Sequence, residues 1–81
     1  MSDQRQGVTE TQHEVLDLIE ANQPDWSELP LFVRLFRGAA RAQHAWAEVD
    51  PERRRAATIE AAALLISAAD DMKPGAPGAF A

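Results

Sequence analysis

Carboxylates and histidines at helical spacing are the residues of this chain that could do acid–base or metal chemistry. Glu10 and His13 are three residues apart, the spacing that places a carboxylate and an imidazole on one helix face in di-iron bundles. His13 with Asp17, and His44 with Glu48, are four apart and could form metal clips or proton-transfer pairs. The alternative is ordinary pairing of exposed side chains, which we favour because bundle metal sites need ligands that project inward. We therefore expect no catalytic residue, no metal and no cofactor.

Arginines at helical spacing are the second chemical feature. Arg34, Arg37 and Arg41 could contact the phosphates of a nucleic acid or the carboxylates of an acidic partner. Alternatively these arginines and residues 53–55, which are also arginines, pair with a second subunit or with the acidic residues of the first helix. Residues 1–28 hold seven acidic residues and one arginine, whereas residues 29–59 hold six arginines and three acidic residues. The acidic residues of the first helix that could pair are Glu10, Glu14, Asp17 and Glu20. The net charge of −5 argues against nucleic acid, and so does the position of the phenylalanines, which lie on the apolar side of the predicted helix and not among the arginines.

The length and composition limit the class of protein. Eighty-one residues allow one small domain, whose hydrophobic core is marginal without a disulfide, a metal or oligomerisation. The chain has no cysteine, which excludes disulfides and thiolate metal sites. The longest apolar run, residues 61–69, is too short to span a membrane, and the polar residues 1–7 do not resemble a secretory signal. We expect a cytoplasmic protein that does not associate with membranes.

Hydrophobic periodicity predicts an all-α fold with helices at about 9–22, 28–49 and 51–73. These helices would form a single domain, residues 9–73, between a flexible N-terminus, residues 1–8, and a disordered Pro/Gly/Ala tail, residues 74–81.

Capping residues set the expected helix boundaries. Thr9 and Gln12 resemble a capping box at the start of the first helix, and Pro24 should end that helix at about residue 22. Asp25 or Ser27 could cap the second helix, whereas Asp50 is a good N-cap for the third.

The second and third helices have more apolar surface than a lone three-helix unit can bury. Apolar residues cover about 200° of the second helix, twice the usual width, and residues 61–69 are apolar nearly all round. Gly38, in the middle of the second helix, could permit close helix approach or a bend. We therefore predict a homodimer that completes a helical bundle, or docking to a protein partner. The predicted contact residues are Leu35, Phe36, Trp46, Leu64, Leu65 and Ile66.

The segment from Ala45 through Asp50-Pro51-Glu52 to Arg55, continuing from Ile59 to Asp70, resembles the last two helices of phage-type MazG-like nucleotide pyrophosphohydrolases. The resemblance covers about a third of the chain. It implies a magnesium site made by acidic pairs at helical spacing. Here residues 37–41 read Arg-Gly-Ala-Ala-Arg where the first acidic pair should lie, which leaves Glu48, Glu60 and Asp70 as ligands.

The sequence thus predicts a small regulatory or accessory protein that works by protein–protein interaction and not by catalysis. Two alternatives stay open, a degenerate MazG-like protein and a nucleic-acid-binding protein that uses the arginine stripe.

Overall fold

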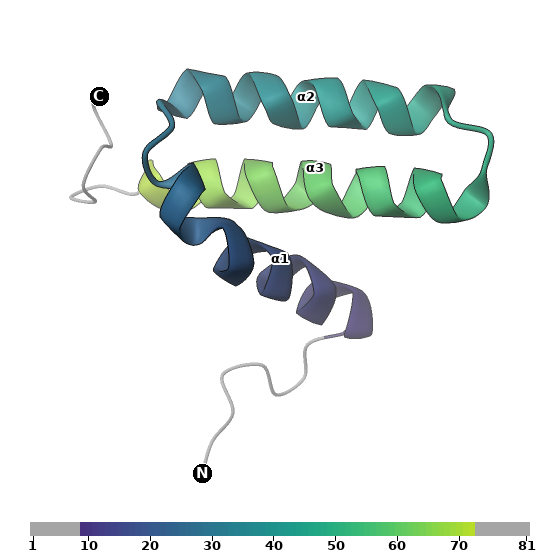
Figure 1. The fold of residues 1–81 in the computed structure, drawn as a ribbon, viewed down its shortest axis with the longest axis horizontal. Helices are drawn as coiled ribbons and strands as arrows, with labels where there is room; N and C mark the ends of the chain where they lie inside the picture. Colours follow the sequence, from purple (N-terminus) through teal and green to yellow (C-terminus); the bar gives the residue numbers. More distant parts are fainter. Residues whose placement is uncertain (1–8, 73–81) are drawn as a thin grey trace, which may run out of the picture.

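The computed structural model describes residues 9–72, which form three α-helices joined by short connections (Figure 1). These are α1 (Glu10–Trp26), α2 (Leu31–Ala47) and α3 (Pro51–Asp71). The all-α prediction with three helices is therefore confirmed. The predicted flexible N-terminus, residues 1–8, and the predicted disordered tail, residues 74–81, lie outside the described residues.

Helix α1 begins as predicted and ends later than predicted. Thr9 and Gln12 form a complete capping box, in which each side chain bonds the other residue's backbone N–H. The expected end at residue 22 is wrong, because the helix continues through Pro24 to Trp26. Trp26 is buried against Val15 and Leu64, and this packing outweighs the helix-breaking tendency of the proline.

Helix α2 starts at Leu31 without a side-chain cap. Pro30 is the N-cap, and its carbonyl accepts the first helical bonds from Val33 and Arg34. The prediction that Asp25 or Ser27 caps this helix is wrong. Ser27 is instead the C-cap of α1, where its hydroxyl donates to the Pro24 carbonyl.

Helix α3 starts at its predicted N-cap. The Asp50 carboxylate accepts a hydrogen bond of 2.9 Å from the Arg53 backbone N–H, and Pro51 occupies the first helical position. The helix ends at Asp71, two residues before the predicted boundary.

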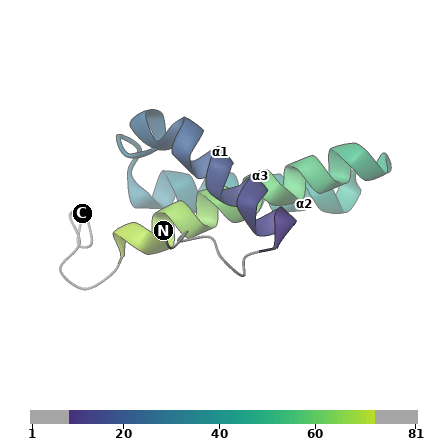
Figure 2. The same ribbon diagram turned by 90° about the horizontal axis from the view of Figure 1, so that it is seen from below.

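Helix α3 is the central element of the fold, since α1 and α2 each pack against it (Figures 1 and 2). Helices α2 and α3 run antiparallel and side by side, whereas α1 crosses α3 obliquely. The contacts of Gly38 with Leu65, Arg41 with Glu60, and Arg34 with Ser67 set the register of the antiparallel pair. The middle of α2 consequently lies beside the middle of α3.

Large side chains form the core between α1 and α3, whereas small ones line the seam between α2 and α3. The core contains Val15, Trp26, Ala63 and Leu64. The buried residues of the seam include Gly38, Ala45, Ala57, Ala61 and Ala68. A Cβ atom at Gly38 would lie 2.8 Å from Leu65 Cδ2, so this glycine permits the close helix approach that the sequence suggested.

No helix within residues 9–72 is both long enough and apolar enough to cross a membrane.

Candidate interaction surface

The carboxylate–histidine pairs do not assemble a metal site in the described part of the chain. Residues 9–72 contain no group of three or more His, Cys, Asp or Glu side chains placed to hold a metal ion. Nε2 of His44 lies 3.7 Å from Glu48 Oε2, a contact within the last turn of α2. Glu60 pairs with Arg41, so Glu48, Glu60 and Asp70 do not converge as the MazG resemblance would require.

The three arginines of α2 do not form one exposed stripe. Arg34 is 3% exposed, so it is not accessible to the phosphates or acidic partner that its spacing suggested. Its guanidinium lies 2.7 Å from the Asp71 carboxylate and donates to the Ser67 hydroxyl. Arg41 forms an ion pair of 3.0 Å with Glu60, whereas Arg37 is exposed. Arg34 and Arg41 are thus held by carboxylates of α3 and not, as expected, by those of the first helix. This pairing places them poorly to bind phosphate.

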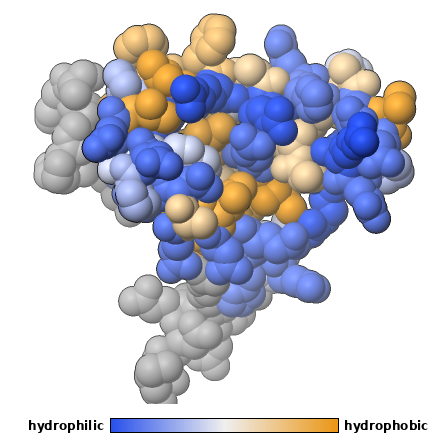
Figure 3. All heavy atoms as spheres, viewed as in Figure 1, coloured by the Kyte–Doolittle hydropathy of each residue, from blue (hydrophilic) through white to orange (hydrophobic). Residues whose placement is uncertain are grey.

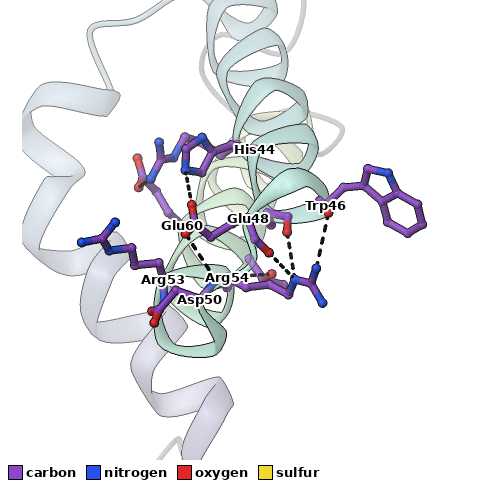
Figure 4. Close-up of polar contacts among 10 residues, drawn as sticks. His44, Trp46, Glu48, Asp50, Arg53, Arg54 and Glu60 are labelled. Atoms are coloured by element: carbon purple, nitrogen blue, oxygen red, sulfur yellow. Dashed lines mark hydrogen bonds and ion pairs between the residues drawn. The ribbon is translucent and has the colours of Figure 1, made fainter.

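Arg54 closes the C-terminal end of α2. Its Nε donates to the carbonyls of Ala45 and Glu48, at 3.1 and 2.9 Å, and its Nη2 lies 3.5 Å from the Trp46 carbonyl (Figure 4). The last carbonyls of a helix lack partners within the helix, and the helix dipole favours a cation there. Arg54 is therefore used to join α2 to the start of α3.

Arg55 joins α3 to α1 through a bidentate ion pair with Glu14. Nη1 donates to Oε1 at 2.9 Å, Nη2 donates to Oε2, and Nη2 also bonds the Thr11 hydroxyl. The hydrogen bond and the charge of Arg55 lower the pKa of the Glu14 carboxyl, and the same pairing raises the pKa of Arg55. This contact agrees with the expectation that arginines pair with the acidic first helix.

Helix α2 directs its largest apolar side chains into solvent. Phe32 is 72% exposed, Phe36 is 76% exposed and Trp46 is 86% exposed. The side that packs against α3 instead carries Arg34, Gly38 and Ala45. Apolar side chains gather along the α2 edge of the molecule in Figure 3. An amphipathic helix normally buries its apolar stripe, so this stripe is free to contact another molecule.

The exposed stripe of α2 continues onto α3. With about 100° between successive residues, Leu35, Ala39, Ala42 and Trp46 point to the same side of α2. Leu65 touches Gly38 from α3 on this side, which α1 leaves uncovered. We name the combined surface the α2–α3 face and define it by nine residues, none of them charged: Leu35, Ala39, Ala42, Trp46, Thr58, Ala62, Leu65, Ala69 and Met72. Ala62 is half-buried at the inner edge of this face and also packs against the core between α1 and α3.

A shallow hollow of about 260 Å³ lies in this face near the C-terminal end of α2. Ala42, Ala45 and Trp46 line it from α2, and Arg54 and Thr58 line it from α3. In Figure 4 the Trp46 ring projects away from both helices, on the side opposite Glu60 and His44. The face therefore presents a projecting aromatic side chain beside a recess.

The six predicted contact residues fall into three groups. Leu35, Trp46 and Leu65 belong to the α2–α3 face, and Phe36 lies at its outer edge on α2. Ile66 is exposed on the flank of α3, outside the face as defined. Leu64 is only 2% exposed within the core of the single chain, and we leave it out of the contact surface. Phe32 is nearly as exposed as Phe36 but was not among the predicted contact residues, although its place in the apolar arc of α2 could have indicated it.

A second depression, an open groove of about 810 Å³, separates α1 from α3. Leu18, Ala21 and Ile59 are among its apolar lining residues. Its polar lining residues are Glu14, Asp17, Asn22, Glu52, Arg55 and Glu60. Three of these charged residues already form ion pairs within the protein, Glu14 with Arg55 and Glu60 with Arg41. They are therefore less available to bind a charged ligand in the groove.

Comparison of the chain with known protein families, curated proteins and solved structures finds no match. The MazG resemblance is therefore not supported by these comparisons.

Proposed function

We propose that this protein is a small, non-enzymatic interaction module whose α2–α3 face binds protein. The observation that carries the proposal is the orientation of α2, whose large apolar side chains lie in solvent while its small and charged side packs on α3. Single exposed apolar residues are common, but a continuous uncharged face of two helices is typical of association surfaces.

The composition of the face fits a protein partner better than a nucleic acid or a small polar substrate. Aromatic residues and methionine are enriched at protein interfaces, and charged residues are depleted at their centres. Trp46 and Met72 are partly or fully exposed on this face, and Arg54 at its border donates to three backbone carbonyls of the chain itself. The role we propose is therefore regulatory or accessory, with binding as the activity.

Photo-crosslinking in the native host tests the proposal. The photoreactive amino acid p-benzoyl-phenylalanine would replace Phe36 or Trp46, and in a control it would replace Gln23, an exposed residue of α1. We expect irradiation to give covalent protein adducts from the two α2 positions and none from the control. Equal yields from all three positions, or no adduct from Phe36 and Trp46, would refute an interaction role for this face.

A further inference from the structure

We propose that the occupant of the α2–α3 face is a second copy of this chain, packed so that each helix lies antiparallel to its own counterpart. The twofold axis would cross the α2–α3 pair at the level of Ala39 and Ala62. Helix α2 would then pack on α2 of the second copy, and α3 on α3. This inference rests on the proposed function and names the partner for the same surface.

The size of the face suits a small homodimer. A helix of 17 residues such as α2 is about 25 Å long, and two helices about 9 Å apart form a face about 20 Å wide. The contact would bury about 500 Å² on each copy and about 1,000 Å² in total, the lower limit for a specific interface. Phe32 and Phe36, at the edge of the face, would add to this area.

The distribution of charge permits two copies to approach despite a net charge of −5 each. Helix α1 carries five acidic residues and no lysine or arginine, and it leaves the α2–α3 face uncovered. The nine residues that define the face are uncharged, and Arg54, which lines the hollow in it, already donates to three backbone carbonyls of its own chain. Like-charged groups of the two copies would therefore be kept apart.

The charges at the two ends of α3 favour the antiparallel arrangement over a parallel one. Residues 51–55 include three arginines and one glutamate, and with Glu14, the ion-pair partner of Arg55, this end has a net charge of +1. Asp70 and Asp71 lie at the other end, which has a net charge of −1 when Arg34, the partner of Asp71, is included. Both sets oppose the dipole of their own helix, which favours anions at the N-terminus and cations at the C-terminus. An antiparallel α3–α3 pair places the arginine end of one helix beside the aspartate end of the other and offsets both costs.

The shape of the face also fits this arrangement. Because Ala39 lies midway along α2, the twofold axis brings Trp46 of one copy over the first turns of α2 in the other, where Phe32 and Leu35 are exposed. The hollow beside Trp46 would in turn receive apolar side chains from the same region of the second copy. Small side chains at the centre, Ala39 and Ala62, allow the helices to approach closely.

Single-cysteine variants test the geometry cleanly because the natural chain has no cysteine. We expect Ala39→Cys, at the twofold axis, to form a disulfide-linked dimer under mild oxidation. Crosslinking should be on the order of tenfold or more faster than for Ala21→Cys, an exposed alanine of α1, because association raises the effective thiol concentration. Circular dichroism of the reduced variants confirms that both fold.

Mixing Ala39→Cys with Ala62→Cys distinguishes the two twofold arrangements. The antiparallel dimer predicts Ala39→Cys homodimers and Ala62→Cys homodimers, whereas a parallel dimer, with α2 on α3 of the other copy, predicts mainly the mixed disulfide. Predominance of the mixed product, or equal rates for Ala39→Cys and Ala21→Cys, would overturn the inference. If the cellular adducts from Phe36 are all heteromeric, the self-association is overturned while the interaction module stands; if there are no adducts, the proposed function itself fails.

Discussion

Arg34 of α2 and Asp71 of α3 form an ion pair of 2.7 Å in which the arginine is almost completely buried. The same guanidinium donates a hydrogen bond of 3.1 Å to the Ser67 hydroxyl. The Arg34 Nε atom has no hydrogen-bond partner among the described residues. The buried positive charge of Arg34 is therefore stabilised mainly by Asp71 and Ser67. The pair fixes the start of α2 against the end of α3, and with it the direction in which the apolar stripe of α2 points.

Loss of Asp71 should therefore destabilise the fold. We expect Asp71→Asn to lower the free energy of unfolding by about 2 to 3 kcal/mol, below the cost at a fully buried pair because the Asp71 side chain is 32% exposed. Glu28→Gln, at an exposed position between α1 and α2, should cost less than about 0.5 kcal/mol. Urea denaturation measures both. Equal effects of the two substitutions would show that the buried pair has no special role.

The close approach at Gly38 gives a prediction that depends on side-chain size. Gly38→Ala should change the free energy of unfolding by less than about 1 kcal/mol. The gain in helix propensity offsets the cost of moving the partly exposed Leu65 side chain away from the new methyl group. Gly38→Leu should destabilise by about 2 to 3 kcal/mol, since it forces α2 away from Ala61 and Leu65. Thermal unfolding measures the difference. A stable Gly38→Leu variant would contradict the close packing of the α2–α3 seam.

The Glu14–Arg55 pair predicts a dependence of stability on pH. Because Arg55 lowers the pKa of Glu14 in the folded state, the unfolded state binds a proton there more readily as the pH falls. The contribution of Glu14 is therefore complete above the usual carboxyl pKa of about 4.3 and is lost as the pH falls through the lowered folded value. NMR titration should show the pKa of Glu14 returning to its usual range in Arg55→Gln. An unchanged pKa in that variant would rule out the pairing in solution.

Arg54 should stabilise the last turn of α2. Replacement by glutamine removes donors to Ala45, Glu48 and Trp46, and we expect a loss of about 1 kcal/mol. Amide hydrogen exchange should show faster exchange at residues 44–48, and little change at α1. Arg53→Gln, next to Arg54 at the exposed start of α3, is the matched control. The same increase in exchange for both variants would argue against a capping role.

The helices could be predicted from the sequence because their signals are local. The Thr9–Gln12 capping box and the Asp50 N-cap each depend on residues within one turn, and both occur as expected. Pro24 gave the wrong end for α1, because burial of Trp26 by residues far along the chain outweighs the local preference. Ser27 was misplaced for a related reason, since it caps the extended α1.

The rotation of α2 about its own axis could not be predicted from the sequence. Its apolar arc of about 200° fits several rotations of the helix. The rotation that the structure shows depends on the pairing of Arg34 with Ser67 and Asp71, which lie far along the chain. Leu64 was predicted to be a contact residue for a similar reason. Leu64, Leu65 and Ile66 are consecutive and all apolar, and the sequence alone does not show which of them α1 covers. The excess of apolar surface could be predicted without knowing the rotation of α2 or the position of α1.

The solution molar mass of the purified protein, measured by light scattering over a range of concentrations, tests the central claim most directly. We predict a mass that rises toward twice the 8.9 kDa of the chain, and a single-chain mass for Leu65→Glu, which places a charge in the α2–α3 face. The matched Ala21→Glu variant on α1 should associate like the natural protein. A single-chain mass for the natural protein at every concentration, or no effect of Leu65→Glu, would contradict self-association through this face.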